Sequence, residues 1–465
     1  MITTSEQLET YLESFTGFQK RAVGHSLPWL RDLREAAFAR FCEVGFPTTH
    51  DEDWRFTNVS AIARTQFELA PGGEVAAKDA ERFRVSGAAC QLVFVDGKFA
   101  PTLSSTSHLP PGVRANGLAR EIARNSDALE PHLGRYLNIQ RDAFSALNTA
   151  FAEDGAYVHI PKGVVLEAPV ALLFIATESA KPLMTHPRNL IVVEAESQAT
   201  VVEDYVSLGS TAAFSNTATE LVSGENAVVS HYMIEREHQQ TFNISTLRIQ
   251  AARSANLSSH SVLIGGGLVR NNVHPVLAGE GAECLINGLF LGDGGQHLDN
   301  YMLVEHVSPH CASRQFYNGI LDGHAHGVFH GRIIVHKDAQ KTDAKQTNRN
   351  LLLSDDARID TKPQLEIYAD DVKCTHGATI GQIEENALFY LRSRGIDEVA
   401  ARKLLLLAFA SECLDRMRPS PAREHVETLI HDSLLSFAAA PGQAGAGVSK
   451  PRQQADEGRN WEEMG

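Results

Sequence analysis

The chain has 465 residues, long enough for two or three domains with well-buried cores, and a formal net charge of −15. This acidic balance argues against nucleic acid or an anionic membrane as the main partner. The longest apolar runs, such as Val170–Ala176, fall far short of the ~18 residues that span a bilayer, and the first residues lack the basic and apolar regions of a signal peptide. We therefore expect a cytoplasmic protein.

The first 140 residues predict a mixed region of helices and short strands. One helical stripe is formed by Leu8, Tyr11, Leu12 and Phe15. A second helix is expected to begin at Pro28 and to end at Gly45. The apolar run Leu92–Val95, with Asp96-Gly97 behind it, favours a small hairpin. Residues 1–140 should thus form an N-terminal helical and α+β region.

Residues 141–382 have a different sequence pattern, in which short runs of β-branched residues alternate with turn residues. A weak repeat centres on small residues spaced by 28, 28 and 27 positions, namely Ala199, Ala227, Ala255 and Ala282. Less regular copies surround Ala339 and Ala357, and the stretch between Leu285 and Gly331 is expected to break the period. Because a strand–turn–strand unit cannot bury its inner face alone, stacked units of this kind predict a β-solenoid. A β-sandwich is the main alternative, but it gives no reason for a constant repeat.

Helical spacing returns after the strands end near Ile380. Val399, Leu404 and Leu407 lie near one stripe, and further leucines widen it, so this helix needs cover from other helices or from a partner. A second helix is expected after Pro421, which gives a C-terminal helical domain over residues 383–437. The Gly-, Ala- and Gln-rich tail, 438–465, is expected to be disordered.

The strongest candidate site is the strand-like stretch YADDVKCTHGAT. In a strand its thiol and imidazole, Cys374 and His376, share one face. These are ligands that iron and zinc accept, but a closed site needs about four, so the others would come from elsewhere, for example from another chain. The six cysteines include no Cys-x-x-Cys pair, which excludes a self-contained zinc finger or ferredoxin. The alternative is that both side chains only pack, as buried free cysteines commonly do.

A second group of candidates is the histidine-rich stretch GHAHGVFHGRIIVH. Its members are His324, His326, His330 and His336. A His-x-His pair can bind metal, for example as a transient iron-holding patch. Solvated histidines are equally compatible with strands and turns, and we expect no nearby carboxylate at a matching step.

Paired carboxylates raise a further alternative, a stand-alone β-helix polysaccharide lyase or hydrolase. Asp355-Asp356 and Asp370-Asp371 are the two pairs, but adjacent strand residues face opposite ways, so they are expected at the corners of the turns. The sequence also has no Gly-x4-Gly-Lys-Ser/Thr loop, so we expect no nucleotide to be bound by this chain itself.

Four stretches together resemble the SufB/SufD family, the scaffold subunits of the SUF iron–sulfur cluster assembly machinery. They are Phe46–Val59, Ala146–Phe174, Asp343–Gly381 and Leu391–Glu412. The first of them is more similar to the SufD branch than to the SufB branch. The resemblance implies a right-handed parallel β-helix between helical ends and a scaffold that is not an enzyme. It also implies pairing with a SufB-like subunit and docking of a SufC-like ATPase on the C-terminal helices.

The resemblance further implies that the matched histidine, His376, lies at the nascent cluster site. The cofactor would be a transient Fe–S cluster shared with the partner subunit, whose cysteine would supply a thiolate. Cys374 would be a weaker ligand candidate. Whether the chain also forms a homodimer without its partner is left open by the sequence.

Overall fold

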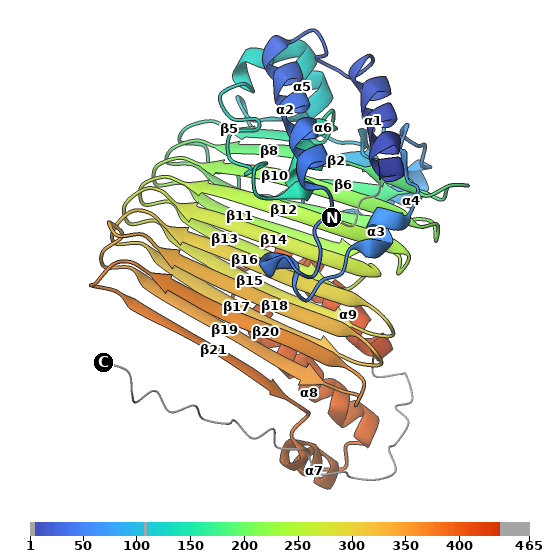
Figure 1. Ribbon diagram of the computed structural model, residues 1–465. Coiled ribbons are helices and arrows are strands. Elements are labelled where there is room, and N and C mark those ends of the chain that lie inside the picture. Colours follow the sequence, from blue (N-terminus) through green and yellow to red (C-terminus); the bar gives the residue numbers. More distant parts are fainter. Residues whose placement is uncertain (1–4, 107–108, 438–465) are drawn as a thin grey trace, which may run out of the picture.

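A computed structural model describes residues 5–106 and 109–437 as a β-solenoid with helices at both ends (Figure 1). The mainly β fold expected from the repeat is therefore confirmed. The tail expected to be disordered, 438–465, lies outside the described residues. None of the helices in the described ranges is both long and apolar enough to cross a bilayer.

Two sheets form the walls of the solenoid, and successive turns add strands to them alternately. Sheet A contains, in spatial order, β4 (Arg114–Gly117), β5 (Ala156–Ile160), β8 (Arg188–Val193), β10 (Ala213–Ser223), β12 (Thr241–Ala251), β14 (Leu268–Leu277), β16 (His297–His306), β18 (His326–Val335) and β20 (Arg358–Ile367), with β7 (Leu183–Thr185) and β1 (Glu68–Leu69) beside it. Sheet B contains β3 (Lys98–Phe99), β2 (Cys90–Val95), β6 (Val170–Ala176), β9 (Gln198–Ser207), β11 (Val228–Arg236), β13 (Asn256–Leu263), β15 (Glu283–Gly292), β17 (Ala312–Leu321), β19 (Asp343–Leu352) and β21 (Lys373–Gly381).

The strand register confirms two of the three repeat spacings. Val228 pairs with Asn256 and Asn256 with Glu283, which gives the predicted steps of 28 and 27 residues. The first spacing is wrong, because Ala199 pairs with Val229 rather than with a residue 28 positions on. The error of two residues keeps every side chain on its predicted face, because side chains alternate with a period of two.

The expected break in the period after Leu285 is also wrong. Glu283 pairs with Ala312, and the parallel ladder continues without interruption from β15 to β21. The two later repeat copies differ in kind: Ala339 precedes β19 in sheet B, whereas Ala357 precedes β20 in sheet A. Neither of them occupies the register position of Ala227, Ala255 and Ala282, which directly precede their strands in sheet B: Thr342 takes that position before β19.

Helices cover the outer face of each sheet. The helical elements are α1 (Ser5–Gln19), α2 (Pro28–Val44), η1 (Glu52–Trp54), α3 (Ser60–Arg64), α4 (Ala77–Glu81), α5 (Leu118–Asn125), η2 (Ser126–Ala128), α6 (Ala143–Ala150), α7 (Glu385–Ser393), α8 (Glu398–Leu414) and α9 (Pro421–Phe437). Side chains of α1, α2 and α6 pack on sheet A around Phe214 and Ile244. Those of α8 and α9 pack on sheet B around Tyr232 and Val262.

The N-terminal expectations are confirmed at the level of single elements. The second helix begins at Pro28, and Gly45, with φ of 64°, follows its last residue. Asp96 and Gly97 both have positive φ and connect β2 to β3 as an antiparallel hairpin. β2 also pairs in parallel with β6, so the first 140 residues contribute strands to the solenoid itself.

Two buried carboxyl groups, separated by one residue, lie at the end of β11. Ser215 Oγ donates to Glu237 Oε1 at 3.0 Å, and Asn243 Nδ2 donates to Glu237 Oε2 at 2.7 Å. The second carboxyl belongs to Glu235, which accepts from the Glu237 amide at 2.9 Å. Burial raises the pKa of Glu237 from its ordinary 4.5 to about 7. The folded protein therefore holds this proton more tightly than the unfolded chain.

We expect Glu237→Gln to make the protein more stable at about pH 8 but not at about pH 5. A raised carboxyl pKa means that stability falls as pH rises from 4.5 through about 7, and glutamine removes that fall. The gain at the higher pH should be about 1–3 kcal/mol in urea unfolding. The exposed Glu280→Gln serves as the control. An equal change at both pH values would contradict the prediction.

Candidate functional site

The last strand of sheet B, β21, has a free edge. Among the residues that the structure describes, its only neighbour in the sheet is β19, and it lies at the C-terminal end of the stack (Figure 1). The Lys373 amide donates to Thr342 O at 2.8 Å, so this residue points its backbone groups toward β19. Because backbone direction alternates along a strand, Cys374, His376 and Ala378 point their N–H and C=O groups to the open side.

The side chains of Cys374 and His376 lie on the inner face of the solenoid wall. Cys374 pairs with Ala344, which belongs to the solenoid core cluster, and the Cys374 side chain packs against that cluster. His376 pairs with Gln346 and lies two residues further along the same face. It is exposed, since no further strand follows β21 within residues 382–437. The imidazole therefore stands at the mouth of the solenoid interior, beside a free strand edge.

The thiol of Cys374 is less available than the imidazole. Its side chain is half-buried against the core, and this burial raises the pKa of the thiol above its ordinary value. Metals and electrophiles react with the thiolate rather than with the thiol. In the chain alone, Cys374 is therefore a weaker ligand candidate than His376.

No group of three or more His, Cys, Asp or Glu side chains within residues 5–106 and 109–437 is placed to hold a metal ion. The other five cysteines are free, and four of them are buried, namely Cys90, Cys284, Cys311 and Cys413. The expectation that a site at His376 takes further ligands from another chain stays a prediction.

The four histidines of the second candidate group have separate partners. His326 Nε2 lies 2.7 Å from Asp360 Oδ2, His336 Nε2 lies 3.3 Å from Glu305 Oε2, His324 Nδ1 lies 3.5 Å from Asp356 Oδ2, and His330 Nε2 lies 2.9 Å from Gln364 Oε1. The expectation that no carboxylate lies nearby is wrong. These carboxylates belong to neighbouring turns of the solenoid, about thirty residues away in sequence, and stacking brings them alongside the histidines. The partners differ from one histidine to the next, so the stretch forms no common site.

The paired aspartates lie in bends between strands, as expected. Asp355-Asp356 precedes β20 and Asp370-Asp371 precedes β21. Asp371 forms an ion pair with Lys341 on the neighbouring turn. Neither pair presents two carboxyl groups to one face of a sheet, so these aspartates do not favour the polysaccharide lyase or hydrolase.

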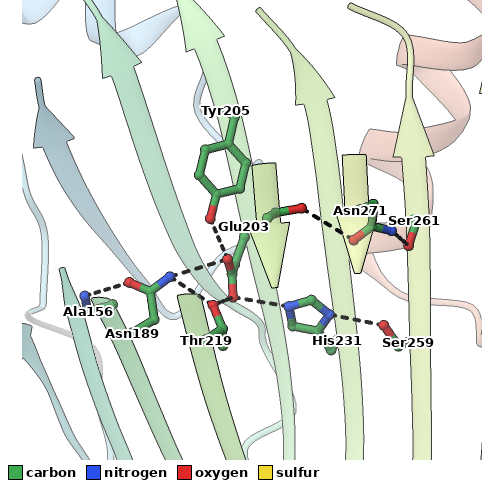
Figure 2. A network of polar contacts seen from close by, with 10 residues as sticks. Ala156, Asn189, Glu203, Tyr205, Thr219, His231, Ser259, Ser261 and Asn271 are labelled. Carbon is green, nitrogen blue, oxygen red and sulfur yellow. Dashed lines mark hydrogen bonds and ion pairs between the residues drawn. The ribbon is translucent and has the colours of Figure 1, made fainter. Parts of the chain in front are cut away.

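A polar network inside the solenoid was missed by the sequence reasoning. Figure 2 shows Glu203 at its centre: Tyr205 Oη donates at 2.6 Å, Thr219 Oγ1 donates at 2.8 Å, and His231 Nε2 lies 3.1 Å away. Burial raises the pKa of Glu203, but the hydrogen bonds from His231, Tyr205 and Thr219 outweigh it and hold the pKa below its ordinary value. The carboxylate is thus kept charged in the interior by its partners.

The repeat itself carried a signal for this network. Glu203, His231 and Ser259 each follow a repeat alanine by four positions, namely Ala199, Ala227 and Ala255. Ser259 Oγ lies 3.2 Å from the other ring nitrogen of His231. His231 and Ser259 are in register, and Glu203 lies two positions further along the same inward face. Polar residues on the inward face of three consecutive turns predict buried polar contacts, since adjacent turns stack.

Two protein-family models and several known proteins match most of the chain. The SufBD protein N-terminal region matches residues 5–172, and the SUF system FeS cluster assembly, SufBD core domain, matches residues 174–409. An iron–sulfur cluster assembly SufBD family protein of Synechocystis sp. is 36% identical over 397 residues, which cover 83% of this chain and 87% of the relative. The iron–sulfur cluster assembly protein SufD of Escherichia coli is 32% identical over 393 residues, which cover 84% of this chain and 90% of the relative. The core-domain match includes β21 and hence both candidate ligands.

Proposed function

Because this chain belongs to the SufBD family of SUF iron–sulfur cluster assembly proteins, we propose that it is a non-catalytic scaffold subunit that holds a nascent cluster as cargo. The observation that carries the proposal is the exposed imidazole of His376 beside the free edge of β21. A free edge invites pairing with another chain, and a pairing chain brings further ligands to the same place.

The chemistry of the site follows from its two ligand candidates. A neutral imidazole binds iron through one ring nitrogen, and His376 offers this group. A thiol, by contrast, must lose its proton before it binds a metal. A cysteine thiolate from a SufB-like partner would complete the ligand set together with sulfide. Cys374 becomes a ligand only when the metal displaces its proton. The cluster is thereby transient and shared between two chains.

The two terminal strands differ in their ability to pair with a partner. The Tyr368 amide donates to Val335 O across the β18–β20 ladder, so even-numbered residues of β20 face β18 and odd-numbered ones face outward. Pro363 therefore occupies an outward position and offers no N–H, which makes this edge less able to pair with another strand. β21 contains no proline. We place the SufB-like subunit, or a second copy of this chain in its absence, on β21.

The C-terminal helices provide the second contact, with a SufC-like ATPase. Phe389 on α7 is 75% exposed and Leu404 on α8 is 46% exposed, which is unusual for large apolar side chains. α8 is also anchored to sheet B, because Asn318 Nδ2 donates to Phe409 O at 2.9 Å and Asn287 Nδ2 donates to Cys413 O at 2.8 Å. A displacement of α8 by the ATPase would be passed to β15 and β17, and so toward the partner edge.

We expect the double variant Phe389→Glu and Leu404→Glu to weaken binding of the SufC-like ATPase by about tenfold or more, since it charges two apolar contacts. Binding to the SufB-like subunit should be unchanged. Titration calorimetry with each purified partner provides the measurement. Leu12→Glu on α1, where the leucine is 51% exposed, is the matched control. Unchanged ATPase affinity in the double variant would remove these helices from the interface.

The proposal as a whole is tested by purifying the endogenous complex. A SufC-like ATPase and a SufB-like subunit should co-purify with the chain from the cytoplasm, and the complex should take up iron and sulfide. We expect no nucleic acid and no membrane in the preparation, and no nucleotide bound by this chain itself. A polysaccharide lyase would instead purify alone and cleave uronate polymers, and the bends that hold its aspartates do not favour it.

A further inference from the structure

Gln346 lies directly beside His376 on the inner face of sheet B. The two residues pair in the parallel ladder between β19 and β21, so their backbones are about 4.8 Å apart and their side chains point the same way. Gln346 is 1% exposed, although its neighbour stands open to solvent. The open end of the solenoid thus has a buried amide just below the exposed imidazole.

The amide of Gln346 is only half satisfied. Its Nε2 donates to Gln315 Oε1 on the next turn inward at 2.6 Å. Its Oε1 is buried and has no hydrogen-bond partner among the described residues. Buried carbonyl oxygens are rarely left unpaired, because they lose hydration without replacement. The ring of His376 is the nearest in-register group on the open side, and none of the hydrogen bonds found within the described ranges uses it.

The position of the amide is fixed from the opposite wall. Gly331 on β18 has no side chain, and a Cβ there would lie only 2.0 Å from Gln346 Nε2. The glycine therefore leaves the space that the amide occupies across the interior. The space left by Gly331 and the hydrogen bond to Gln315 together keep the Gln346 side chain inside the solenoid, below its open end.

We propose that Gln346 is a positioning residue for His376. Its Oε1 accepts a hydrogen bond from one ring N–H of His376, which selects one tautomer and leaves the other ring nitrogen, without a proton, directed to the open end. A metal-binding histidine is oriented in this way by an acceptor on its second nitrogen. The inference rests on the proposed function for its use, but the hydrogen bond itself is a property of this chain alone.

The test is ¹⁵N NMR of the histidine tautomers in the full chain, labelled only at histidine. The signals of His376 are identified by their loss in His376→Gln. We expect a single tautomer in the wild-type protein, a mixture close to that of free imidazole in Gln346→Leu and in Gly331→Ala, and a single tautomer again in Gln346→Glu, which keeps an acceptor. Gln364→Leu is the matched control, because Gln364 accepts from a different histidine, His330, on the outer face.

A tautomer mixture in the wild-type protein, or no change in Gln346→Leu, would overturn the proposal. The wild-type spectrum alone tests whether His376 has a single tautomer, so the proposal can be refuted even if a variant fails to fold. Cluster assembly with the partner proteins is a separate readout, in which Gln346→Leu should lower the yield severalfold and Gln346→Glu should restore it. Normal yield in His376→Ala, with the tautomer change still seen in Gln346→Leu, would refute the cluster role and leave the hydrogen bond standing.

Discussion

Replacing His376 by alanine is expected to lower the yield of assembled clusters by about tenfold or more, while the complex with its SufB-like and SufC-like partners still forms. The imidazole is exposed at the mouth of the solenoid, so its loss removes a ligand candidate without opening a cavity in the core. Iron and sulfide content per complex after anaerobic reconstitution measures the yield. Size-exclusion chromatography of the same sample measures assembly.

The matched control for this prediction is His336→Ala. His336 is also solvent-accessible, but it follows β18 and pairs with Glu305 away from the free edge. Its removal should leave the yield within about twofold, because it touches neither β21 nor the interior. Cys374→Ser should have a smaller effect than the loss of the imidazole, since the thiol is half-buried. Normal cluster maturation in His376→Ala would contradict the ligand role.

The solenoid could be predicted because its physics is local and repeated. Alanines at near-constant spacing mark corners where only a small side chain fits, and Ala227, Ala255 and Ala282 are all fully buried there. The one wrong spacing, between Ala199 and Ala227, arises because the connection from β9 to β11 through β10 is two residues longer than the connection from β11 to β13. Small residues mark a corner but do not report the length of the loop beside it.

For the candidate site, the sequence predicts only how residues of the same strand lie relative to one another. The period of two places Cys374 and His376 on one face, and the end of the β pattern places them near the last turn. The partners of the histidines could not be foreseen, because His326 meets Asp360 only through stacking of adjacent turns. Gln346 was missed for the same reason: its place beside His376 depends on the register of β19 and β21.

The second large effect is expected at the free edge itself. Ala378→Pro removes a backbone N–H that points away from β19, so the chain should keep its own ladder and unfold within a few degrees of the wild-type temperature. A partner strand that pairs with β21 would lose this donor and leave its own carbonyl buried and unpaired. That costs about 1–3 kcal/mol, which corresponds to about fivefold to 150-fold weaker binding of the SufB-like subunit.

Two variants separate loss of pairing from loss of folding. Ala378→Val keeps the N–H and a residue suited to strands, so it should bind the SufB-like subunit as the wild-type protein does. Thr379→Pro removes instead a donor that faces β19, since backbone direction alternates from Lys373 onward, and it should lower the unfolding temperature of the chain alone. Calorimetric binding and thermal unfolding of all three variants give the comparison. If Ala378→Pro binds as tightly as Ala378→Val, the partner does not add a strand to β21, and the ligands that complete the site at His376 must approach from the mouth of the solenoid rather than along its edge.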